Sequence, residues 1–149
     1  MTRPLIAAAA FLFTLFAAGQ ATAQTLQPAA DENLEWAASV VQINQVPNQP
    51  SLGVKLFGMA GGDPAMNGLQ TYIGFFASPG EGWRVFQIGD FLSYRILSAT
   101  PGRVNLQIQE NTINSEGEIG TRTRRVSLRW TPRRSDDERP ATVVMARIR

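Results

Sequence analysis

The fold is decided by residues 103–130, which read RVNLQIQENTINSEGEIGTRTRRVSLRW. Apolar and polar residues alternate with a period of two at both ends of this stretch, which is typical of strands with one packed face and one face in water. Asn114-Ser115-Glu116-Gly117 between them is a turn sequence, so the two halves are expected to form one long antiparallel hairpin. The residues expected to face the core are Val104, Leu106, Ile108, Val126, Leu128 and Trp130.

Outward from this hairpin, turn signals recur every eight to twelve residues and separate short runs rich in β-branched and aromatic residues. This spacing predicts an all-β domain over residues 34–149, built as a small antiparallel barrel or sandwich of about seven or eight strands. The first segment is ambiguous, because Asp31-Glu32-Asn33 would cap a helix over 34–43 while Val40, Val41 and Ile43 favour a strand. The expected strands lie near residues 35–45, 52–59, 69–77, 83–89, 91–99, 103–113, 120–131 and 141–148.

The N-terminal residues 1–23 have the pattern of a bacterial Sec-type signal peptide. Arg3 precedes the apolar run Leu5 to Ala18, and Ala21-Thr22-Ala23 supplies small residues before Gln24. A run of this length is too short to cross a bilayer of about 30 Å. The sequence therefore predicts cleavage after Ala23, a disordered lead-in over 24–33, a periplasmic or secreted location, and no transmembrane span after cleavage.

The chain has neither cysteine nor histidine. This composition excludes disulfides, cysteine nucleophiles and imidazole proton transfer, and it makes a zinc, copper or haem cofactor unexpected. The enzymatic function that remains open is hydrolysis by a pair of carboxylates. The candidates are Asp63, Glu81, Asp90 and Glu110, but each lies in or beside a turn, where such residues are common for backbone reasons. We expect no enzyme activity and no cofactor.

Charge is distributed unevenly along the predicted mature chain. Residues 24–118 carry nine acidic and four basic side chains, whereas residues 119–149 carry nine arginines and three acids. One interpretation is a solvated face balanced across the hairpin by Glu110, Glu116 and Glu118. The alternative is a surface for an anionic partner, with Arg125, Arg129, Arg133 and Arg134 as its candidate residues. The small net charge of the whole chain argues against a nucleic acid as that partner.

Aromatic residues are concentrated between Tyr72 and Tyr94, which hold seven of the ten that follow Ala23. Adjacent rings such as Phe75 and Phe76 must point to opposite faces of a strand. Either both faces of this region are covered, or some rings form an exposed aromatic platform for a sugar or a partner, with Trp83 and Tyr94 as candidates.

These observations favour an exported, non-catalytic envelope protein that binds a macromolecular partner, as an accessory or assembly factor or as an inhibitor-like module. The partner expected is an envelope protein or an anionic envelope component. The alternative is a periplasmic β-barrel that binds a small apolar or sugar ligand, and a carboxylate-pair hydrolase comes third. The sequence leaves the oligomeric state open.

Overall fold

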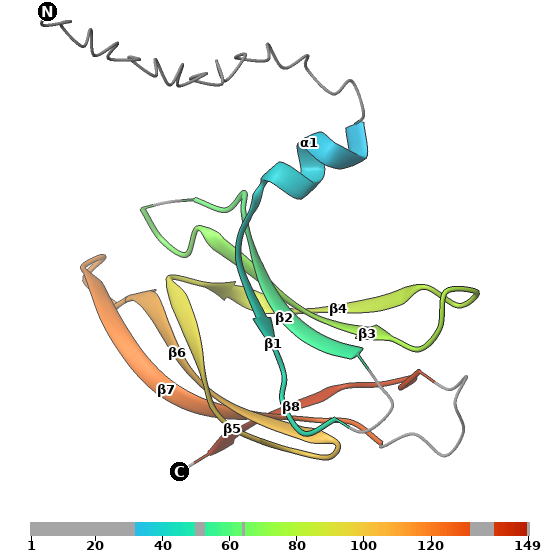
Figure 1. The fold of residues 1–149 in the computed structure, drawn as a ribbon. Coiled ribbons are helices and arrows are strands. Elements are labelled where there is room, and N and C mark those ends of the chain that lie inside the picture. The colour runs from blue at the N-terminus through green and yellow to red at the C-terminus, as the bar shows by residue number, and fades with distance from the viewer. Residues whose placement is uncertain (1–31, 50–52, 64, 132–138, 149) are drawn as a thin grey trace, which may run out of the picture.

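The computed structural model describes residues 32–49, 53–63, 65–131 and 139–148. They form a short helix and two four-stranded antiparallel sheets, which lie as two layers, one above the other in Figure 1. The elements are α1 (Glu32–Ala38), β1 (Val40–Gln45), β2 (Gly53–Ala60), β3 (Leu69–Phe76), β4 (Trp83–Phe91), β5 (Ser93–Thr100), β6 (Arg103–Ile113), β7 (Ile119–Arg129) and β8 (Val144–Ile148). The predicted signal peptide and its cleavage site lie outside the described residues.

Each sheet pairs its strands in chain order, β1-β2-β3-β4 and β5-β6-β7-β8. The expectation of an all-β fold is confirmed, and because the described strands form two separate sheets rather than a closed barrel, the architecture is a sandwich. Only Leu92 separates β4 from β5, so the chain passes directly from one sheet to the other. A register shift opposite Thr71 and Tyr72 and a positive φ of 144° at Gly89 mark a bulge near this crossing, and bulges bend strands.

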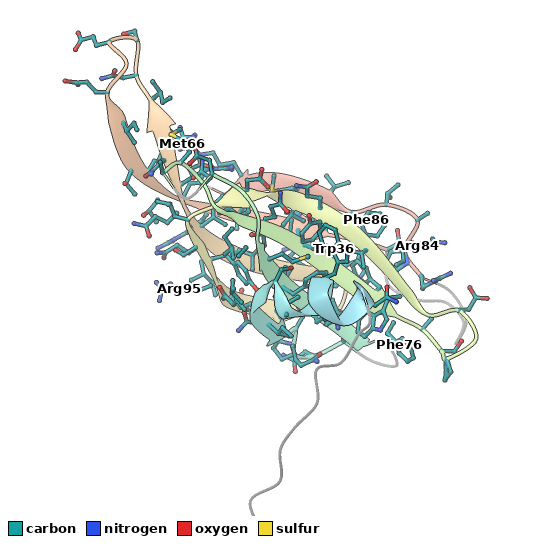
Figure 2. The ribbon with its side chains drawn as sticks, turned by 90° about the horizontal axis from the view of Figure 1, so that it is seen from above. Trp36, Met66, Phe76, Arg84, Phe86 and Arg95 are labelled. Atoms are coloured by element: carbon teal, nitrogen blue, oxygen red, sulfur yellow. The ribbon has the colours of Figure 1, made fainter. Side chains whose placement is uncertain are left out.

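The long hairpin predicted from the sequence is confirmed as β6 and β7, strands of eleven residues each. Its register runs from Arg103 opposite Arg129 to Ile113 opposite Ile119. The Asn114 side chain closes the turn, because its Oδ1 accepts hydrogen bonds from the backbone N–H groups of Glu116 and Glu118 at 3.0 and 2.9 Å. Figure 2 shows that this hairpin projects well beyond the rest of the two sheets.

The core lies between the sheets and contains the apolar set predicted from residues 103–130. Val104, Leu106, Ile108 and Leu128 are fully buried. Phe75 of β3 completes the centre: its ring makes edge contacts with Trp130 and Phe86, with ring centroids 5.1 and 5.8 Å apart. The other buried apolar residues are Val46, Val54, Leu56, Ile73, Ile88, Phe91, Tyr94 and Val126.

The ambiguous first segment contains both of the elements that its sequence suggested. The helix α1 covers Glu32–Ala38 and the strand β1 begins at Val40, so a strand over the whole of 35–45 is wrong. The change falls where β-branched residues begin, since Val40, Val41 and Ile43 fit an extended backbone better than a helical one. In the described part of the chain, no helix is long and apolar enough to span a membrane.

Candidate functional site

The four arginines Arg95, Arg103, Arg125 and Arg129 lie on the outer side of the β5–β8 sheet, and we call them the arginine face. Each is exposed, while the alternate residues of the same strands point into the core. The register brings them together from three strands: Arg103 is opposite Arg129, and Gln107 lies between Arg95 and Arg125. Figure 2 shows Arg95 at the opposite end of the molecule from Arg84 and Phe76.

Of the predicted binding residues, Arg125 and Arg129 therefore belong to this face. Arg133 and Arg134 lie outside the described residues. Arg95 and Arg103 were not among the binding residues predicted from the sequence, because they come from strands that are not rich in arginine. The signal that identifies them is the strand register, which places both on the same side of the sheet as Arg125 and Arg129.

No carboxylate lies on the outer side of β5–β8 among the strand residues that the structure describes. These four strands carry seven arginines and one acid, Glu110. Glu110 is two residues from the buried Ile108 on the same strand, so both side chains point to the inner side of the sheet, away from the arginine face. The face is consequently cationic without an internal counter-charge.

Glu110 neutralises other arginines of β7. Its Oε1 is 2.6 Å from Arg122 Nη2 and 2.9 Å from Arg124 Nε. The hydrogen bonds from Arg124 and then Arg122 stabilise the charged carboxylate and lower the pKa of Glu110, although partial burial opposes this shift. The balance expected across the hairpin thus holds for Arg122 and Arg124. Glu116 and Glu118 lie in the turn at the hairpin tip, and Glu118 accepts a hydrogen bond from Asn114 there.

Amide and hydroxyl groups order the surface between the arginines. Arg95 Nη2 donates to Gln107 Oε1 at 2.8 Å, and Asn105 Nδ2 donates to Ser98 Oγ at 2.9 Å, both between neighbouring strands. Ser127 departs from the outward pattern of β7, because it is only 2% exposed and its Oγ has no hydrogen-bond partner in the described part of the chain. Of the four arginines of the face, Arg95 is thus held by a hydrogen bond to the neighbouring strand.

Arg103 and Arg129 form a like-charge pair directly across β6 and β7. Like charges at opposed positions of an antiparallel pair destabilise the sheet. Within the described residues, neither arginine has an ion pair to compensate. Such an arrangement costs stability in the free protein, and a bound anion would remove this cost.

The predicted aromatic residues lie on two different surfaces. Trp83 is on the outer side of the β1–β4 sheet, 43% exposed, with its ring against Phe76 at 5.2 Å and Lys55 Nζ 4.0 Å from its centroid. Tyr94 is 5% exposed and belongs to the core, so it is not available to an exposed platform. Its inward direction follows from the register, because it is opposite Ile108 of the buried face.

Further apolar side chains are exposed on the outer side of the β1–β4 sheet. Val41, Ile43 and Val85 are 62%, 57% and 47% exposed. The rings of Phe57 and Tyr72 stack with centroids 5.3 Å apart, and the register places Phe57 opposite Ile43 and Tyr72 opposite Phe57. The two outer surfaces of the sandwich therefore differ in kind: one is aliphatic and aromatic, and the other is cationic.

The four carboxylates considered for hydrolysis each have a hydrogen-bond partner. Glu110 pairs with Arg122 and Arg124, and Glu81 is 2.7 Å from Arg139 Nη2. Asp90 accepts from Gln87 Nε2 at 3.1 Å, and Asp63 accepts from the backbone N–H of Ala65 at 2.9 Å, as expected of a turn residue. Among the described residues, no three acidic side chains gather where they would hold a metal ion.

Comparison of the chain with protein-family models, with curated proteins and with solved structures finds no match. The two outer surfaces of the sandwich are the candidate functional sites, and the arginine face has the more specific chemistry of the two.

Proposed function

We propose that this protein is a non-catalytic binding protein of the bacterial envelope and that its arginine face docks on an acidic surface of a partner protein. The observation that carries the proposal is the exposure of Arg95, Arg103, Arg125 and Arg129 on one side of a sheet with no carboxylate among its described strand residues. Guanidinium groups bind carboxylates through paired N–H donors, so the complementary surface is rich in aspartate and glutamate.

A protein partner is favoured because the sheet holds the backbone of these arginines at fixed intervals. Arg125 and Arg129 are four residues apart on β7, which corresponds to about 14 Å along an extended strand. Arg103 lies directly across from Arg129, so two charges are paired at one end of this interval. Carboxylates on a folded partner can match such spacing, and the amide and hydroxyl groups between the arginines supply directional hydrogen bonds to it.

The test compares two double variants of equal net charge. Arg103→Ser/Arg129→Ser removes half of the arginine face, whereas Arg84→Ser/Arg122→Ser removes two arginines from elsewhere. The protein that begins at Gln24 and the two variants are used to capture partners from envelope extract, and the recovered partner is purified for titration. Each exposed contact contributes about 1 kcal/mol, so the face variant is expected to bind about 30-fold more weakly with a flatter salt dependence.

Equal binding by both double variants would refute the arginine face as the docking surface. Retention of the protein on vesicles of anionic lipid, lost in the face variant and with no protein captured, would identify a lipid surface instead. The first result overturns the proposed surface but keeps a protein partner, whereas the second overturns the protein partner but keeps the proposed surface.

The proposed location follows from the predicted signal peptide. Export by a Sec-type route with cleavage after Ala23 yields a protein that begins at Gln24. Intact-mass measurement of the protein from a periplasmic fraction tests this. Recovery of a chain that retains Met1 to Ala23 would contradict it.

A further inference from the structure

The strand β7 is paired on both sides over less than half of its length. β6 lies opposite all eleven of its residues, whereas β8 pairs only with residues 125–129. Residues 119–123 are all exposed and belong to the part of the hairpin that projects beyond the two sheets (Figure 2). Within the described part of the chain, no strand lies beside residues 119–124 on the side away from β6, and we call this side of β7 the open edge.

The hydrogen bonds of the hairpin show which backbone groups point to the open edge. In an antiparallel pair, opposed residues alternately exchange two hydrogen bonds or direct their N–H and C=O groups away from each other. The N–H of Asn114 donates to the carbonyl of Glu118, and the N–H of Trp130 donates to the carbonyl of Gly102, both at 3.0 Å. In the register of β6 and β7, these bonds place the exchanging pairs at the even-numbered residues of β7. The odd-numbered residues of its projecting part therefore direct N–H and C=O groups to the open edge, and they are Ile119, Thr121 and Thr123.

The opposite edge of the same sheet is capped by side chains. Where β6 extends past β5, Asn67 Oδ1 accepts from the backbone N–H of Asn111 at 2.8 Å, and Asn67 Nδ2 donates to the carbonyl of Asn111 at 3.2 Å. Along β5, the side-chain amides of Gln42, Asn48 and Gln49 donate to backbone carbonyls. An uncovered strand edge is a template for another strand, and native proteins commonly cover such edges. Among the described residues, the open edge of β7 has no comparable cap.

A hollow of about 620 Å³ lies where β8 ends and the open edge begins. Its lining residues come from both sides of the sheet, as expected at a step in the edge of a sheet, and they are Gln107, Thr123, Arg124, Arg125, Arg147 and Ile148. The last pair of β7 and β8 is Arg125 opposite Ile148. Thr123 is the next residue of β7 whose backbone points to the open edge, and it also lines the hollow. The free space therefore adjoins the position that an added strand would occupy.

The charges on the inner side of the open edge indicate what kind of segment fits it. Arg122 and Arg124 point to this side, and one carboxylate, that of Glu110, is shared between them. Arg147, on the inner side of β8, has no ion pair within the described residues. A second copy of this chain paired through the same edge would bring further arginines to this side. A segment with acidic side chains at alternate positions would instead supply the missing negative charge.

We propose that the open edge of β7 binds an extended acidic segment of another protein as an added antiparallel strand. Six residues of such a segment match residues 119–124 and span about 20 Å. Its side chains opposite Arg122 and Arg124 are carboxylates, and those on the other side are β-branched, because such residues pair well across strands. This surface is separate from the arginine face, and the inference does not rest on the docking function proposed for that face.

The probe is the end-blocked hexapeptide Glu-Val-Glu-Val-Thr-Val, whose antiparallel register places its glutamates opposite Arg124 and Arg122. Two N-methylated forms of it are compared by calorimetry. Methylation of the first two valines removes N–H groups that would donate to the open edge, whereas methylation of the second glutamate and the threonine removes N–H groups that point away. The first form is expected to bind about 30-fold more weakly than the parent peptide, since two hydrogen bonds of about fivefold each are lost. The second form is expected to bind about as well as the parent.

Variants of the protein that begins at Gln24 test the same contacts from the other side. Thr123→Pro removes an N–H group from the open edge and leaves the bonds between β6 and β7 in place, while the control Thr123→Val keeps that group. Arg122→Gln is expected to weaken peptide binding about fivefold, and its control Arg103→Gln, on the arginine face, is expected to change it little. In wild type, the peptide should slow hydrogen exchange at the amides of Thr121 and Thr123. If Thr123→Pro fails to fold, the two methylated peptides decide the question on the wild-type protein.

Equal binding of the two methylated peptides, unchanged exchange at Thr121 and Thr123, or no binding at millimolar peptide would overturn the proposal. Self-association of the free protein that Thr123→Pro abolishes, with no peptide bound, would identify a second copy as the occupant and would also overturn it.

The double variants of the docking test separate this inference from the proposed function. A captured protein that is lost with Arg84→Ser/Arg122→Ser but kept with Arg103→Ser/Arg129→Ser binds at the open edge and not at the arginine face. The converse loss, together with no peptide binding, keeps the docking function and removes this inference.

Discussion

The opposed arginines of β6 and β7 lead to a prediction in which stability and binding change in opposite directions. Arg103 and Arg129 are Cα partners in the antiparallel register, and both are exposed. Replacing Arg129→Glu converts a repulsive pair into an attractive one. Cross-strand charge pairs contribute about 0.2–1 kcal/mol, so relief of repulsion together with new attraction is expected to raise the free energy of unfolding by about 1 kcal/mol.

For a domain of this size, that change corresponds to an increase in Tm of about 4 °C. The measurement is thermal and urea unfolding of wild type and Arg129→Glu at low salt and at 1 M NaCl. Because the Debye length is only about 3 Å at 1 M ionic strength, the increase should largely disappear at high salt. Binding of the acidic partner should weaken in the same variant.

Two further variants isolate the pairwise contribution. Arg125→Glu makes the same charge change on the same face of β7, but its partner on β6 is the neutral Gln107, so a smaller increase is expected. The double variant Arg103→Glu/Arg129→Glu restores a like-charge pair and should lose most of the gain. A lower Tm for Arg129→Glu at low salt, or equal effects of Arg125→Glu and Arg129→Glu, would refute the proposed repulsion.

Three other predictions concern the interior and the inner side of the hairpin. Glu110→Gln should lower the free energy of unfolding by about 1 kcal/mol at neutral pH. Since the pKa of Glu110 is lowered in the folded state, this difference should vanish as the pH falls through that value, and a pH-independent difference in urea unfolding would contradict the ion pairs. Leu106→Ala should cost about 2–5 kcal/mol in the same assay, because Leu106 is fully buried; a loss under 1 kcal/mol would argue against this core. Burial raises the pKa of Tyr94 to about 12, and its hydroxyl has no partner in the described residues, so Tyr94→Phe should leave stability unchanged or raise it by up to about 1 kcal/mol; a clear loss would reveal a hydrogen bond to that hydroxyl.

The hairpin was predictable from the sequence because its information is local. Alternation over 103–108 and 126–130 assigns each residue to a face, and Asn114 and Gly117 mark the turn. The apolar residues assigned to the core are buried, and Arg125 and Arg129, assigned to the outer face, are exposed, so both assignments are confirmed. The helix α1 was harder to predict, because only Ser39 separates it from β1. The sequence of the two elements together resembles one segment that contains both helix-favouring and strand-favouring residues.

The composition of the arginine face was only half predictable, because it depends on contacts between strands. Arg95 is brought beside Gln107 by the β5–β6 register, and a register shift between Ile96 and Ser98 interrupts the alternation of β5. Tyr94 shows the same limit: its burial depends on being opposite Ile108, which sequence spacing does not specify. Of the two alternatives for this aromatic region, the exposed platform is therefore excluded for Tyr94 by tertiary structure.

The excess of positive charge on the outer side of the β5–β8 sheet depends on the side to which a single acidic residue points. Glu110 is the one acid in β5–β8, and its inward position brings it to Arg122 and Arg124. One residue earlier, a carboxylate would lie on the outer side, opposite Thr123 and two residues from Arg125 along β7. The inner arginines would then lack their counter-charge and the outer face would acquire one. The same parity that stabilises the projecting hairpin through an ion-pair network therefore leaves the outer arginines available to a partner, so the structural and the proposed binding roles of the sheet have a common origin in the position of Glu110.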